Sequence, residues 1–223
     1  MYFHLDLKLY PNLKDLTFKS HDYPIAHNTT LIPEKQHYHV EVPEKSSIDV
    51  YWAHPIPMDR HHKDYLPLML GIFILGGNFS ARLMRTVRDE EGLTYGVYSR
   101  LAGMHDHVEG FWYVHATFSP ALFDKGEKSI FKQINLWHQD GVNVQEFESH
   151  KQGIIGKHLV GTSTTSGLMS SLTQVISQSL DLDYIDRYPQ LIRDISIDDV
   201  NRCIHTYIKP NELRRFSAGQ ISS

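Results

Sequence analysis

An arginine and a tyrosine, seven positions apart, are the side chains of this sequence best suited to chemistry on a bound ligand. Arg88 and Tyr95 lie in the stretch GGNFSARLMRTVRDEEGLTY, residues 76–95. Gly92 between them allows a sharp reversal of the chain, which could bring both side chains to one edge of a sheet. A guanidinium and a phenol are hydrogen-bond donors. Directed outward, they suit a peptide carbonyl, or the oxyanion that develops when that carbonyl is attacked.

The same pair also has a purely structural interpretation. Arg88 falls near the C-terminal end of a predicted helix, where it could pair with the acidic run 89–91. Tyr95 falls near the start of a predicted strand and could be half-buried. On spacing alone, this structural interpretation is favoured over the functional one.

The fifteen histidines invite a metal hypothesis, but their spacing does not support one. The chain contains no His-Glu-x-x-His, His-x-x-Glu-His or Cys-x-x-Cys pattern. His37 and His39 share a strand face, but the sequence places no further ligand beside them. The adjacent pair 61–62 points in two directions, and His-Asp-His at 105–107 lies in a turn. We therefore expect solvated surface histidines, with no metal site and no cofactor in this chain.

Nucleophilic and nucleotide-binding chemistry also have little support. Cys203, the single cysteine, lies on an apolar helical stripe, which is typical of a buried structural thiol. There is no Gly-x-Ser-x-Gly elbow, and the hydroxyl-rich stretch GTSTTSG at 161–167 is typical of a link between helices. Gly76 and Gly77 are not followed by the Lys-Ser/Thr of a phosphate loop.

The composition is ordinary for a globular domain. The chain has 223 residues, 41% of them hydrophobic and 22% charged, with a net charge of −4. A domain of this size can bury a sizeable core without disulfides or a structural metal. Nucleic-acid binding is not expected, because there is no basic excess. The most apolar run, residues 66–75, contains Pro67 and is too short to span a bilayer. No signal peptide is visible, and a cytoplasmic and a periplasmic location both fit.

The order of predicted elements favours an α+β fold, in which helices pack on one face of an antiparallel sheet. Alternating residues predict strands at 37–42 and 47–53, paired around the turn PEKS. Two more strands are expected at 95–101 and 108–118, and one face of the second should carry Trp112, Val114, Ala116 and Phe118. Residues 1–35 are predicted to be an N-terminal arm or the remnant of a preceding segment, and residues 36–223 to be the domain.

Helices are expected between and after these strands. The first spans 63–75 and ends at the two glycines, and Ser80 is predicted to cap a second helix that Gly92 closes. Later helices are predicted to begin at Ser119-Pro120, at Asn143 with Glu146, and at Ser196. Residues 213–219 could return as an edge strand.

The stretch DYLPLMLGIFILGGNFSARLMRTVRDEEGLTYGVYSRL, residues 64–101, closely resembles the C-terminal homologous domain of insulinase/pitrilysin-type metallopeptidases, the inverzincins. That family includes the mitochondrial processing peptidase and bacterial zinc proteases. Asp89 stands where the family usually has glutamate. Residues 182–210 are similar to the closing helices of the same domain, so the resemblance covers about 36–223. The matching residues are Leu75, Gly76, Gly77, Phe79, Ser80, Arg82, Leu83, Arg88, Gly92, Leu93 and Tyr95.

The resemblance implies a division of labour between two homologous halves, in one chain or in two. The first half carries His-x-x-Glu-His and binds the zinc that activates water. The second half binds no zinc and supplies an arginine and a tyrosine, which reach the bound peptide and the transition state. Arg88 and Tyr95 match these positions, so the resemblance implies that both bind substrate and act in catalysis. Without His-x-x-Glu-His, this chain should not be a complete peptidase.

Two other possibilities stay open. A degenerate member of the same fold, like the scaffold core subunits of respiratory complexes, would bind a partner and never contact substrate. The retained Arg88 and Tyr95 argue against it. A metal-binding module that uses the surface histidines would carry stoichiometric zinc, which we do not expect. The long glycine insertion of the processing peptidase's non-catalytic subunit is absent, which disfavours that identity.

Overall fold

Five strands form one sheet in the computed structural model, which describes residues 36–220. Their order across the sheet is β1-β5-β2-β4-β3. Neighbouring strands are antiparallel except β1 and β5, which run parallel, so the sheet is mixed. The predicted arm, residues 1–35, lies outside the described residues. The strands are β1 (His37–Glu41), β2 (Ile48–Ile56), β3 (Gly96–Ala102), β4 (Gly110–Phe118) and β5 (Arg214–Gly219).

The predicted pairing of the first two strands is wrong. β5 lies between β1 and β2 and is hydrogen-bonded to both. The short loop after β1 therefore crosses the end of β5 instead of closing a hairpin. β5 itself is an interior strand, not the edge strand expected at 213–219. Alternation along two neighbouring stretches shows that each is a strand, but it contains no information about a partner from the far end of the chain.

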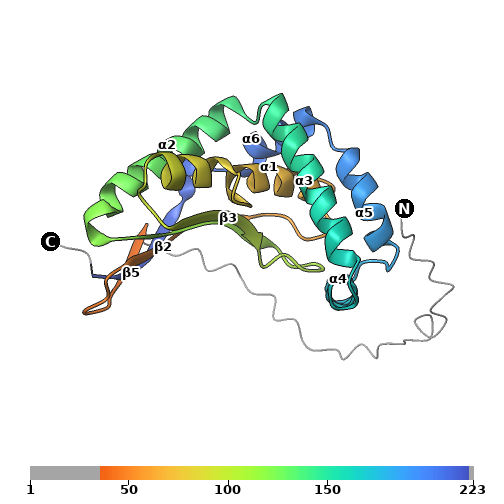
Figure 1. The fold of residues 1–223 in the computed structure, drawn as a ribbon, viewed down its shortest axis with the longest axis horizontal. Helices are drawn as coiled ribbons and strands as arrows, with labels where there is room; N and C mark the ends of the chain where they lie inside the picture. Colours follow the sequence, from red (N-terminus) through yellow and green to blue (C-terminus); the bar gives the residue numbers. More distant parts are fainter. Residues whose placement is uncertain (1–35, 221–223) are drawn as a thin grey trace. The chain divides into compact units, whose positions relative to one another are not determined.

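Helices cover one face of this sheet, as Figure 1 shows, which confirms the predicted α+β arrangement. Two short 3₁₀ helices, Pro120–Leu122 and Pro210–Glu212, precede α2 and β5, and a π-helix spans Met84–Glu90. The α-helices of the described residues are α1 (Tyr65–Gly76), α2 (Phe123–Asp140), α3 (Val144–Thr162), α4 (Thr165–Ser177), α5 (Tyr184–Arg193) and α6 (Ile197–Tyr207).

The covered face of the sheet forms the floor of the core. Every second residue of β2 and β4 is buried, because successive side chains of a strand point to opposite faces. On β4 these buried residues include Trp112, Val114, Ala116 and Phe118, which confirms the predicted shared face. Helix α1 packs above them, and apolar residues such as Leu68 and Leu75 are fully buried.

Helix α1 approaches β3 very closely at Gly76. A Cβ atom on Gly76 would lie 2.7 Å from both the Cβ and the backbone nitrogen of Ser99. The helix does end here, as predicted, but the following Gly77 is right-handed, with φ −83°. The first glycine is therefore needed for helix-to-sheet contact rather than for a left-handed turn.

Replacement of Gly76 by alanine is expected to lower the free energy of unfolding by about 1–3 kcal/mol, because the added methyl group overlaps a strand backbone. Urea unfolding followed by circular dichroism measures this change. Gly153→Ala is the matched control, since a Cβ there meets no atom within 4 Å. The control should be neutral or stabilising by up to about 1 kcal/mol. Equal stability of the Gly76 variant and the wild type would contradict the close contact.

The predicted helix starts have mixed outcomes. Asn143 accepts a hydrogen bond from the Glu146 N–H at 2.9 Å, and the complete capping box is present. Ser196 likewise caps α6. Ser119 precedes the 3₁₀ turn of residues 120–122 without a side-chain cap. The prediction for Ser80 is wrong, because its N–H and hydroxyl both donate to the Asn78 side chain, which forms the turn itself.

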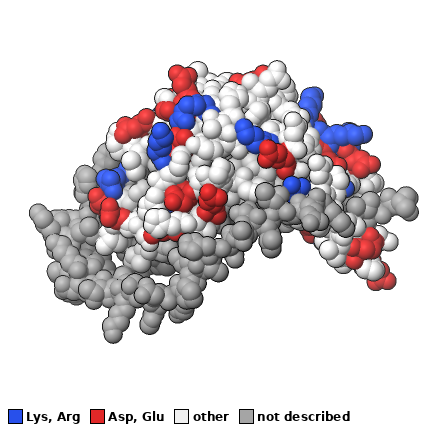
Figure 2. Space-filling model, turned by 180° about the vertical axis from the view of Figure 1, so that it is seen from behind, with Lys and Arg blue, Asp and Glu red and all other residues white. Residues whose placement is uncertain are grey.

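The surface seen in Figure 2 carries basic and acidic side chains interspersed over the described residues. That face offers no continuous basic stripe for a phosphate backbone. Among the helices of residues 36–220, none combines the length and apolarity that crossing a membrane requires.

Candidate functional site

Arg88 is positioned by the π-helix that follows α1. Met84 and Val87 are buried and fix one side of this helix against the core. Its widened last turn is closed by a hydrogen bond from the Leu93 N–H to the Val87 carbonyl at 2.9 Å. Gly92 adopts a φ of +64°, a left-handed conformation that glycine accepts at little cost. π-turns occur frequently at functional sites.

The turn after Gly92 is hydrogen-bonded to the sheet just before Tyr95. Leu93 is buried, and the Thr94 hydroxyl donates to the Thr117 carbonyl of β4 at 2.6 Å. Tyr95 comes next and is 94% exposed. The backbone of Tyr95 is thus held on both sides, while its phenol projects freely into solvent.

Arg88 and Tyr95 line one shared pocket of about 670 Å³. The walls come from the π-helix end, the turn after it, the end of β4 and the loop before β2. The Arg88 guanidinium lies 3.3 Å from the Asp89 carboxylate and 5.8 Å from the centre of the Phe79 ring. Phe79 is itself 77% exposed, so an aromatic surface adjoins the Arg88 guanidinium. The pocket residues are Ser46, Ser47, Arg88, Asp89, Gly92, Leu93, Thr94, Tyr95, Thr117, Phe118, Ser119 and Leu122.

A paired carboxylate, Asp49, is hydrogen-bonded to Thr117 in the wall of this pocket. Thr117 is opposite Asp49 on one side and Gly96 on the other, so these residues cross the sheet in register. The Thr117 hydroxyl donates to Asp49. Hydrogen bonds from Lys45 and then Thr117 hold the pKa of Asp49 below its usual range. Asp49 is consequently an ionised, fully engaged group that supports the pocket floor rather than a free base.

Sequence reasoning found the two donors but missed their supports. Thr94, Thr117 and Asp49 come from separate segments, and only the strand register brings them together. Phe79 stands in the matched motif, yet no role was expected for it.

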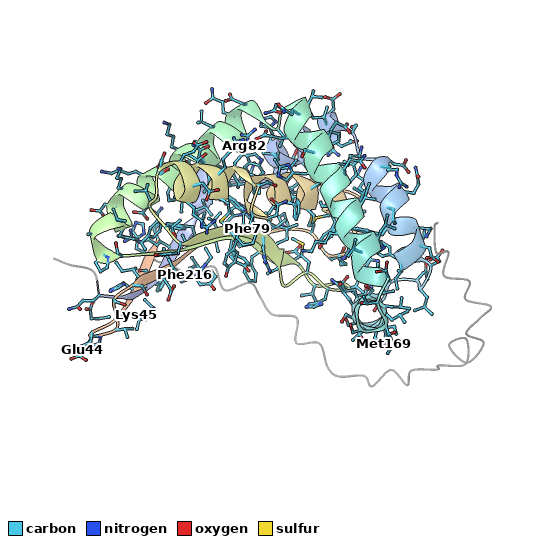
Figure 3. The ribbon with its side chains drawn as sticks, viewed as in Figure 1. Glu44, Lys45, Phe79, Arg82, Met169 and Phe216 are labelled. Atoms are coloured by element: carbon cyan, nitrogen blue, oxygen red, sulfur yellow. The ribbon has the colours of Figure 1, made fainter. Side chains whose placement is uncertain are left out.

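Arg82, another residue of the motif, has a structural function. Its guanidinium donates to the two Glu146 carboxylate oxygens at 2.7 and 2.6 Å and to the Gly141 carbonyl at 2.9 Å. Figure 3 places it in the helix layer, beside the junction of α2 and α3. Burial raises the pKa of Glu146, but the hydrogen bonds and charge of Arg82 outweigh burial and leave the pKa lowered.

The structure brings the histidine segments 61–62 and 105–107 together at Asp106, and His39 has other partners. The two ring nitrogens of His39 contact Ser217 and Glu41 at 3.0 and 3.1 Å. His61 and His107 each lie 3.4 Å from Asp106. Within the described residues, no group of three or more His, Cys, Asp or Glu side chains could hold a metal ion.

Cys203 is fully buried on α6, as predicted. Burial raises the pKa of its thiol to about 12. A thiol with such a pKa is protonated at neutral pH and is not a nucleophile.

The geometry therefore defines a class of protein: an α+β domain with helices over one face of a five-stranded sheet and an arginine and a tyrosine in an open pocket. The family described as the peptidase M16 inactive domain matches residues 8–154, and the chain belongs to this family. The resemblance to the second half of insulinase/pitrilysin-type peptidases is confirmed.

Curated relatives are longer than this chain. Over 164 residues it is 24% identical to the non-peptidase homolog YmxG of Helicobacter pylori, which covers 74% of this chain and 38% of that protein. Over 139 residues it is 28% identical to the chloroplastic stromal processing peptidase of Pisum sativum, covering 60% of this chain and 11% of that protein. The chain thus spans well under half the length of these relatives.

Solved structures share the fold. A peptidase M16 inactive domain from Pseudomonas fluorescens has a TM-score of 0.73 at 24% identity, covering 84% of this chain and 43% of that chain. A protease from Helicobacter pylori has a TM-score of 0.74 at 17% identity, covering 96% of this chain and 52% of that chain. At these identities the likeness concerns the fold alone.

Proposed function

We propose that this chain is the zinc-free half of an insulinase-type metallopeptidase, whose zinc-bearing half lies in the same longer chain or in a separate subunit. The chain would bind peptide and supply Arg88 and Tyr95 to the transition state. The observation that carries the proposal is that both donors line one open pocket on a backbone that the Thr94–Thr117 hydrogen bond fixes.

The two side chains suit this task chemically. Attack on a peptide carbonyl moves negative charge onto its oxygen, and donors already aimed at that oxygen stabilise the charge without reorganising. The Arg88 guanidinium carries a permanent charge, and the Tyr95 phenol adds a neutral donor. The zinc and its water would belong to the partner half, and the peptide would add to a sheet edge of that half.

In the assembled enzyme, Arg88→Ala or Tyr95→Phe should lower kcat by about 100- to 1000-fold, the usual loss when one oxyanion donor is removed. Steady-state turnover of a fluorogenic peptide measures the effect, with the zinc content determined in parallel. Arg85→Ala is the matched control, because Arg85 lies on the same helix but pairs with Glu90 and does not line the pocket.

The control should keep full turnover, and all variants should keep their zinc. Unchanged turnover in both the Arg88 and the Tyr95 variants would reject the catalytic role. It would instead favour a degenerate partner-binding domain, the second candidate, which the non-peptidase name of the Helicobacter pylori relative supports. That candidate predicts that the halves still assemble and that neither donor matters.

The division of the chain into an arm, residues 1–35, and a domain, residues 36–223, stays a prediction. Limited proteolysis with mass spectrometry would test it through the position of the first protected residue.

A further inference from the structure

A second pocket, of about 400 Å³, lies among α1, α3, α4 and α5. It shares no lining residue with the pocket of Arg88 and Tyr95. Two permanent cations, Arg60 and Lys157, line it, and no aspartate or glutamate is among its described lining residues. The remaining walls are aromatic, aliphatic and uncharged polar. The pocket therefore combines positive charge with apolar surface.

Arg60 is the unusual residue of this pocket, because its charge is buried without a counter-ion among residues 36–220. The residue is 9% exposed, yet no carboxylate of the described residues lies within 4.0 Å of its guanidinium. Nε donates to Gln178 at 3.0 Å, and Nη2 donates to the Tyr184 hydroxyl at 2.7 Å. The Tyr65 ring stacks 4.0 Å from it. Buried charges are normally paired with an opposite charge.

One guanidinium nitrogen and two hydroxyls remain available around the same space. Arg60 Nη1 makes no hydrogen bond to another described residue, and neither do the hydroxyls of Tyr65 and Tyr188. Burial raises the pKa of both tyrosines, so their hydroxyls stay protonated and can donate. An acceptor that entered the pocket would thus meet a cation and two neutral donors.

We propose that this pocket binds a carboxylate attached to an apolar group. A single carboxylate matches one buried guanidinium, while Phe73, Ile154 and Val175 provide apolar surface for the rest of the ligand. Lys157 at the exposed side of α3 adds a second attraction for the negative charge. The same chemistry occurs in a small organic acid and at the C-terminus of a peptide that ends in an apolar residue.

Isothermal titration calorimetry on the full chain tests the proposal with two acids and their amides. The acids are octanoate and an acetylated tetrapeptide that ends in leucine with a free carboxyl group. At least one acid should bind, and its amide should bind about tenfold more weakly or worse, because the charge-assisted bond is lost. Whichever acid binds identifies the source of the carboxylate.

Three variants locate the binding. Arg60→Gln should weaken acid binding at least tenfold, but it could also disturb the contacts with α4 and α5. Gly161→Trp is therefore the second variant, since Gly161 lines the pocket on α3 and a Cβ there meets no atom within 4 Å. It should abolish binding without lowering the Tm. Lys157→Gln should weaken binding severalfold, whereas Lys132→Gln, an exposed lysine on α2, should not.

The proposal is overturned if neither acid binds, if acid and amide bind alike, or if Gly161→Trp leaves the affinity unchanged. If neither acid binds, Arg60 serves only to hold its loop against Gln178, directly after α4, and Tyr184 on α5. None of these outcomes depends on the zinc-bearing half or on Arg88 and Tyr95, so this test and the test of the proposed function fail independently.

Discussion

Arg82→Ala is expected to lower the free energy of unfolding by about 3 kcal/mol, among the largest effects of any single substitution in this chain. The side chains of Arg82 and Glu146 are 13% and 12% exposed and meet through two hydrogen bonds. Removal of the arginine leaves the Glu146 carboxylate nearly buried without its counter-charge. The Gly141 carbonyl, at the junction of α2 and α3, loses its donor as well.

Urea unfolding of the single and double variants separates charge from packing. Glu146→Gln keeps a side chain that can complete the capping box with Asn143 but removes the charge. Combined with Arg82→Ala, it should recover part of the lost stability. A double variant no more stable than Arg82→Ala would show that the uncompensated charge is not the cause.

The effect of Arg82→Ala should also depend on pH. The pKa of Glu146 is lowered in the folded chain, so the pair stabilises the fold above the unfolded-state pKa of about 4.3. This contribution is lost as the pH falls through the lowered folded-state pKa. The difference between wild type and Arg82→Ala should therefore be full near neutral pH and shrink in acid below about pH 4.

Trp112→Ala should cost about 3–5 kcal/mol of unfolding free energy. Trp112 is fully buried, its indole N–H donates to the Ser99 hydroxyl at 2.7 Å, and its ring lies 6.1 Å from that of Trp137. The substitution opens a cavity between the sheet and the helices. It also deprives Ser99 of its partner at the point where Gly76 packs against it.

The neighbouring residue provides the control. Phe111 precedes Trp112 on β4 but points to the opposite face and is 42% exposed, so Phe111→Ala should cost at most about 1 kcal/mol. Trp112→Phe keeps an aromatic ring but loses the indole donor, and its loss should lie between the two. Thermal and urea unfolding at matched pH give all three values. Similar losses for Trp112→Ala and Phe111→Ala would contradict the described packing.

The features that the sequence predicted correctly depend on residues close together in the chain. The alternation along β4 identified its buried face, because side chains of a strand alternate whatever the strand pairs with. Asn143 and Ser196 cap helices through contacts within three residues. Ser80 is not a cap: its N–H and hydroxyl donate to Asn78, two residues earlier, and the helix over Met84–Glu90 has no side-chain cap. That contact is also local, but the sequence pattern alone does not rank the two polar residues.

The candidate site also has one part that the sequence predicted and another that it could not predict. The motif located Arg88 and Tyr95, and Gly92 between them does adopt the left-handed turn. The floor of the pocket could not be predicted, because Thr94 meets Thr117 only through the β3–β4 register and Thr117 meets Asp49 only through the β2–β4 register. The contacts of Arg60 could not be predicted either, since Gln178, directly after α4, and Tyr184 on α5 are remote in sequence.

The place of β5 in the sheet has a consequence for biosynthesis. β1 pairs only with β5 among the described strands, and β5 also joins β1 to β2. Strands made early must therefore wait for Arg214–Gly219, the last of the five described strands along the chain, before the sheet can close. Pairing between segments so distant in sequence is slow, and unsatisfied strand edges stay exposed meanwhile. Until translation reaches β5, β1 lacks its only partner among the described strands, and its open edge is free to pair with other chains.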